Sequence, residues 1–105
     1  MIEVDPKVLA DVATGLWRAS RKLEEPGAMR HLQRTLERLA DAGVDLVDPM
    51  GAEFSAGVAL DVVAFHEDPA LTRETVVEVV RPSVYVNGVL VQRGEVIIGT
   101  PKERA

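Results

Sequence analysis

The sequence predicts an α+β protein, with a helical hairpin over residues 1–43 and a small all-β domain of short strands over residues 44–105. Apolar residues recur at helical spacing in the first part, and β-branched residues gather in the second. The charge changes at the same boundary. The first part holds seven basic and seven acidic residues, whereas the second holds five and ten, so the net charge of -5 lies in the β-domain.

The first helix is predicted to begin at Asp5-Pro6, because an aspartate cap followed by proline at the first helical position is a typical start. It is predicted to end in the segment 24–27, since proline disfavours helix in the residue before it. One helical stripe of apolar residues runs between these limits: Leu9, Val12, Leu16, Ala19 and Leu23.

A second helix follows and is predicted to end at Gly43, where a left-handed residue is usual. Two short helices with a tight connection form an antiparallel hairpin, but they cannot enclose a core alone. The hairpin either pairs with a second copy in a dimeric four-helix bundle or folds onto the chain's own second half. For the dimer, the expected interface residues are Leu9, Val12, Leu16, Met29, Leu32, Leu36 and Leu39.

The β-domain is predicted from four β-prone segments. Residues 60–66 and 72–80 read as strands, and residues 95–98 as the last strand. Between them, Asn87-Gly88 separates two apolar triplets, which is the signature of a type I′ hairpin. Strict alternation in the second segment places Glu74, Val76 and Glu78 on one side and Thr75, Val77 and Val79 on the other.

A search for reactive chemistry gives little. Cysteine is absent, which excludes disulfides and thiolate zinc sites and suits a cytoplasmic protein. His31 and His66 read as surface histidines, and the acidic residues Asp45, Asp48 and Glu53 read as turn residues rather than a cation site. We therefore expect no catalytic residue, no cofactor and no metal, and the protein is not expected to be an enzyme.

The remaining class is a binding or oligomeric module. The acidic balance argues against nucleic acid, and no apolar run is long enough to span a membrane. Interfaces need apolar anchors, and the candidates are Phe54, Phe65, Tyr85 and the valine-rich hairpin. In a domain this small the core is expected to take most of them.

Several short stretches resemble the GrpE family, the nucleotide exchange factors of bacterial Hsp70. They are Gly27-Ala28-Met29, LERLADAGVDLV at 36–47, Gly51-Ala52-Glu53-Phe54, TVVEVVRP at 75–82, Asn87-Gly88-Val89-Leu90 and Val96-Ile97-Ile98. Two departures stand out, since the family's Gly-Tyr after the proline is Ser83-Val84 here, and its Leu-Arg-Pro-Ala is Val91-Gln92-Arg93-Gly94. The family's long N-terminal paired helix has no counterpart, so the likeness is to a short or truncated form.

The resemblance implies a homodimeric co-chaperone that binds the ATPase domain of an Hsp70 and promotes ADP release. It implies a contact surface that includes Gly27 at the top of the bundle and three exposed residues of the final hairpin region: Val89, Arg93 and Val96. The alternative is a diverged GrpE-like dimerisation or scaffold module without exchange activity.

Overall fold

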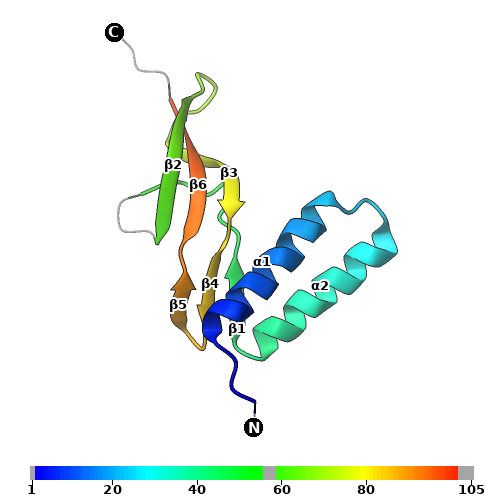
Figure 1. Cartoon of the computed structure of the whole chain (residues 1–105). Coiled ribbons are helices and arrows are strands. Elements are labelled where there is room, and N and C mark those ends of the chain that lie inside the picture. The colour runs from blue at the N-terminus through cyan, green and yellow to red at the C-terminus, as the bar shows by residue number, and fades with distance from the viewer. Residues whose placement is uncertain (1, 56–58, 102–105) are drawn as a thin grey trace. The chain divides into compact units, whose positions relative to one another are not determined.

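A computed structural model describes residues 2–55 and 59–101, and within them it has the predicted α+β fold (Figure 1). A helical hairpin comes first and short strands follow. The elements, in order, are α1 (Pro6–Lys22), α2 (Pro26–Asp41), β1 (Val44–Val47), β2 (Leu60–Glu67), β3 (Thr75–Arg81), β4 (Ser83–Val86), β5 (Val89–Gln92) and β6 (Gly94–Thr100). Among these residues no helix combines the length and the apolar character that crossing a membrane requires.

The chain divides into two compact units, and their boundaries differ from the expected division at Gly43. The first unit, here the helical unit, contains Met1–Leu46 and Val84–Gln92, and the second, the sheet unit, contains Val47–Ser83 and Arg93–Ala105. Strands β1, β4 and β5 therefore belong with the helices. The reason is a shared core, in which Val44 and Val84 pack with Ala10 and Ala13 of α1.

Helix α1 begins as predicted. The Asp5 carboxylate accepts a hydrogen bond from the Lys7 amide at 2.9 Å, and Pro6 occupies the first helical position. The buried face is not the predicted stripe, however. It consists of Ala10, Ala13, Thr14 and Trp17.

Small residues on this face allow a strand to approach closely. The Gln92 side chain of β5 donates a 2.8 Å hydrogen bond to the Thr14 hydroxyl. Helix α1 thus packs on the strands of its own unit through this mostly small-residue face. The spacing of its leucines and valines had predicted a different face.

Helix α2 has Glu25 as its N-cap, and none of its residues is buried. Gly43, with a φ of 97°, follows the helix in the left-handed conformation that was predicted. The connection between the two helices is short, since α1 ends at Lys22 and α2 begins at Pro26.

The sheet of the helical unit has the strand order β1-β4-β5. The Asn-Gly hairpin is confirmed, because Asn87 and Gly88 both have positive φ, 50° and 81°. The Asn87 amide donates to the Gly43 carbonyl at 2.7 Å, which ties this turn to the end of α2. Asp45, which was predicted to be a turn residue, lies in strand β1. Its side chain remains in solvent, whereas the neighbouring Val44 is buried.

The sheet unit has the order β2-β6-β3, with β2 parallel and β3 antiparallel to the central strand β6. The predicted faces of β3 are wrong. The pairing with β6 shifts between Val76 and Glu78, which leaves Val77 as an extra residue. This bulge brings Val76 and Val79 to the buried side, where they lie opposite Ile98 and Val96 in the register.

Candidate functional site

The expected dimer surface consists of large apolar side chains on both helices, and each keeps some access to solvent. Val12 is 48% exposed, and the others are half-buried. Leu9 and Leu39 also pack against the core cluster of the helical unit, so they have partners within the chain. The structure therefore shows packing of the hairpin on its own chain, and it also leaves surface on which a second copy could pack. The hairpin rests on its own strands through one face of α1, while the predicted interface stripe is incompletely covered.

An exposed apolar row on α1 was missed by the sequence analysis. Val8 is 50% exposed and lies one helical turn before Val12, and Val4 is exposed just before the helix. The signal was the spacing of four residues from Val8 to Val12, which places these two side chains one above the other on the helix. Val8 therefore widens the apolar surface next to the predicted stripe.

The start of α2 is held by a carboxylate. Glu25 accepts hydrogen bonds from the Gly27 amide at 2.8 Å and from the Ala28 amide at 2.7 Å. These two backbone hydrogen bonds lower the pKa of the Glu25 carboxyl below its usual value. A Cβ on residue 27 would lie 3.1 Å from both carboxylate oxygens, so the glycine leaves room for this cap. Gly27, which was predicted to be a contact residue, thus has a structural role in this cap.

The hairpin β4–β5 presents Val89 to solvent. Its side chain is 65% exposed, although it directly follows the Asn87-Gly88 turn in a strand of otherwise half-buried residues. The turn is fixed at one side by the bond from Asn87 to Gly43. An exposed apolar side chain beside a turn with a fixed backbone is accessible to a partner.

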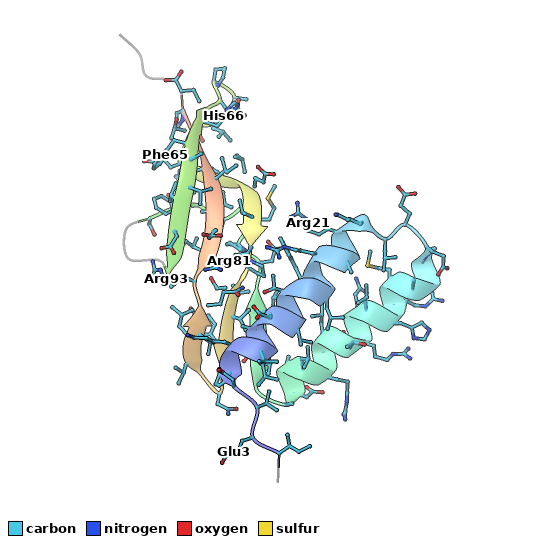
Figure 2. All side chains as sticks on the ribbon, in the orientation of Figure 1. Glu3, Arg21, Phe65, His66, Arg81 and Arg93 are labelled. Carbon is cyan, nitrogen blue, oxygen red and sulfur yellow. The ribbon has the colours of Figure 1, made fainter. Side chains whose placement is uncertain are left out.

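Arg93 is exposed but already engaged within the sheet unit (Figure 2). Its Nε donates to the Asp61 carboxylate at 2.8 Å, and its guanidinium also donates to the Leu60 carbonyl at 3.3 Å. The Arg93 carbonyl in turn accepts a 3.1 Å hydrogen bond from Arg81, which pairs with Glu95 at 3.6 Å. These contacts join the start of β2 to the start of β6, so a partner would compete with them for Arg93.

The expectation that Val96 is exposed is wrong. Val96 has no exposed surface, because β6 is the central strand and its alternate residues Val96 and Ile98 both lie on the buried side. Glu95 and Ile97, between them in the sequence, are half-buried. The hydrophobic run at the end of the chain is therefore core, and it cannot contribute Val96 to a contact surface in this conformation.

Two of the acidic residues considered for cation binding make contacts close by in the structure. Among the residues that the structure describes, no group of three or more histidine, aspartate or glutamate residues could hold a metal ion. The Asp48 carboxylate accepts from the Met50 amide at 3.0 Å, and Glu53 pairs with Arg73 at 3.0 Å. Both acids therefore have local partners.

The candidate surfaces lie on separate units. Gly27, Val89 and the predicted dimer stripe belong to the helical unit, whereas Arg93 and Val96 belong to the sheet unit. Of the expected contact residues, Val89 has the most accessible apolar side chain. No protein-family model matches this chain, and no curated protein matches it either.

Proposed function

We propose that this chain is a GrpE-like co-chaperone that forms a homodimer, binds the ATPase domain of an Hsp70 in the cytoplasm and promotes ADP release. The observation that supports it most is helix α2, which carries large apolar residues at helical spacing and yet has none of them buried. A helix with such a stripe needs a further apolar surface. A second hairpin supplies one, in the arrangement that the GrpE resemblance implies.

The energetics favour pairing through this stripe. Removing apolar surface from water contributes about 25 cal/mol per Å². Leu32 and Leu36 are half-buried within a single chain, so each still has apolar surface to lose to a partner. The polar residues on the other faces of α2, including Arg30 and Arg34, stay in solvent in such a pair.

The proposed mechanism is differential binding rather than bond chemistry. The co-chaperone binds the open, nucleotide-free form of the ATPase domain more tightly than the closed, ADP-bound form. This difference in affinity shifts the population towards the open form and speeds the loss of ADP. Linkage requires the reverse effect as well, so ADP weakens binding of the co-chaperone by the same factor.

The contact surface that we propose centres on Val89. It is an exposed apolar side chain beside a structurally fixed turn, and Gly27 and Arg93 remain candidates at other positions. Val96 is left out because it is buried. In this surface the exposed Val89 side chain supplies the apolar contact.

The test is the release of a fluorescent ADP analogue from a bacterial Hsp70 in a stopped-flow instrument. Addition of the wild-type chain should accelerate release, and the Val89→Lys variant should accelerate it much less. Val80→Lys is the matched control, because it adds the same charge at an exposed valine of β3. An unchanged release rate with micromolar wild-type protein contradicts the proposal.

A second candidate is a dimerisation or scaffold module without exchange activity. It is favoured by the burial of Ser83 and Val84, which stand where the GrpE family has Gly-Tyr, and by the engagement of Arg93 with Asp61. This candidate predicts a stable dimer that retains no Hsp70 in a pull-down. The two candidates therefore share the dimer and differ in Hsp70 binding.

A further inference from the structure

In the sheet β2-β6-β3, one edge strand pairs with a further segment of the chain and the other does not. The outer edge of β3 is covered by the segment 51–54. The Gly51 amide donates to the Val76 carbonyl at 3.0 Å, and the Val76 amide donates to the Ala52 carbonyl at 2.9 Å. A bridge between Glu53 and Thr75 extends this cover. Strand β2 forms the other edge, and within the described residues no strand pairs with its outer side.

The uncovered edge carries apolar side chains. Val63 is 51% exposed and Phe65 is 62% exposed, and every residue of β2 from Val63 onwards is exposed. In the register Phe65 lies opposite Ile98, which has no exposed surface. The aromatic ring therefore belongs to the rim of the sheet, next to buried residues but open itself (Figure 2).

The second half of β2 is a regular strand. A bulge at Val63 interrupts the pairing with β6, since Val62 pairs with Val96 and Ala64 with Ile97. After the bulge, residues 64–67 pair one by one with residues 97–100. Bulges, prolines and lysines protect natural sheet edges, but the half of β2 after its bulge contains neither proline nor lysine. This half is therefore able to accept another strand.

Charge decides which strand fits. Strand β2 carries Asp61 and Glu67 and has no lysine or arginine, so a second copy of β2 would bring acidic strands together. Asp61 is compensated by Arg93, whereas Glu67 forms no ion pair among the described residues. The sheet unit as a whole is also acidic by sequence. A basic residue of a partner strand is attracted to Glu67, whereas a second copy of β2 offers Glu67 no opposite charge.

We propose that the outer edge of β2, over residues 64–67, binds an extended peptide with alternating apolar residues and basic flanks. The peptide adds a strand to the sheet. Its backbone hydrogen bonds then supply affinity, and its side chains supply sequence specificity. One apolar residue of the peptide packs on Phe65, and a basic residue pairs with Glu67.

The probe is the capped peptide Lys-Lys-Val-Thr-Val-Thr-Val-Lys-Lys with a fluorescent label, titrated with the full chain and followed by anisotropy. We expect saturable binding and amide chemical-shift changes in residues 63–67. Phe65→Lys should weaken binding about tenfold or more. Met50→Lys is the matched control, because it adds the same charge at an equally exposed apolar residue of the same unit.

Two further peptides separate the proposal from its competitors. A peptide methylated on alternate backbone nitrogens keeps the charge but cannot complete the strand, so its binding should be lost. This comparison uses the wild-type chain and does not depend on the folding of a variant. Equal binding of the methylated peptide, equal binding of a glutamate-flanked peptide, or no saturable binding at all overturns the proposal. So does self-association of the chain that Phe65→Lys abolishes.

Discussion

The helical unit and the sheet unit build their cores from different side chains. The sheet unit buries large β-branched side chains, with Val96 and Ile98 of β6 opposite Val79 and Val76 of β3. The helical unit buries Ala10 and Ala13 with Val44 and Val84. It also buries Trp17, but it leaves Leu32 and Leu36 of α2 half-buried. The comparison indicates that β6 organises a core of large buried side chains in the sheet unit, whereas the leucines of α2 in the helical unit stay partly accessible to solvent.

The largest expected effect is on the core of the sheet unit. Ile98→Ala removes a fully buried side chain, so it should lower the free energy of unfolding by about 2–5 kcal/mol. The neighbouring Ile97→Ala is the control, because Ile97 is only half-buried and should cost less. Chemical denaturation with hydrogen exchange of β6 amides measures both. Equal losses for the two variants would contradict a one-sided core in this unit.

Gly43→Ala tests how the helical unit is closed at the end of α2. The residue has a φ of 97°, and an added Cβ would collide with the Asn87 side-chain oxygen. We expect a loss of about 2 kcal/mol in the free energy of unfolding, from left-handed strain and displacement of the turn. Thermal unfolding gives the measurement.

The matched control for this position is Gly15→Ala in α1. Nothing lies within 4 Å of a Cβ at Gly15, so alanine should stabilise the helix by about 0.5–1 kcal/mol. If both glycine variants shifted the unfolding temperature in the same direction, the role assigned to Gly43 and Asn87 would be wrong.

The third prediction concerns the uncovered surface of the helical unit. Leu36→Ser should leave the chain folded, since no residue of α2 is buried, but should weaken the dimer about tenfold. Thr35→Ser, at an exposed position of the same helix, is the control. Sedimentation equilibrium measures the dissociation constant. A wild-type chain that stays monomeric at high concentration would remove the dimer from the proposed function.

The same two regions differ in how far the sequence predicted them. Helical spacing, the cap at Asp5 and the Asn87-Gly88 turn depend on residues close together in the chain, and the structure has all three. The burial of Val96 depends on β6 lying between two strands, and local alternation does not indicate which strand is central.

The buried face of α1 was missed for a related reason. Ala10, Ala13 and Thr14 are small, so they contribute little to an apolar stripe, and their burial follows from the approach of strands far along the chain. The bulge at Val77 likewise exchanged the faces of β3 without a local signal. Of the two valines that the GrpE resemblance implies as exposed contact residues, Val89 is exposed and Val96 is buried.

The smallest expected effect is a pH dependence at the start of α2, where the helical unit depends on one exposed carboxylate. Hydrogen bonds from the Gly27 and Ala28 amides lower the pKa of Glu25 from its usual 4.5. The ionised cap therefore stabilises the folded state above the unfolded pKa, and this contribution is lost as the pH falls through the folded pKa. Glu25→Gln should lower the unfolding temperature slightly at neutral pH, and the difference from wild type should shrink below about pH 4.5.

Glu24→Gln removes the same charge without removing the carboxylate that accepts from these amides. Melting curves of the three proteins between neutral and acidic pH give the comparison. A difference between Glu25→Gln and wild type that persists unchanged at acidic pH would assign the effect to packing rather than to the ionised cap. In that case the start of α2 would depend on packing rather than on the charge of its cap.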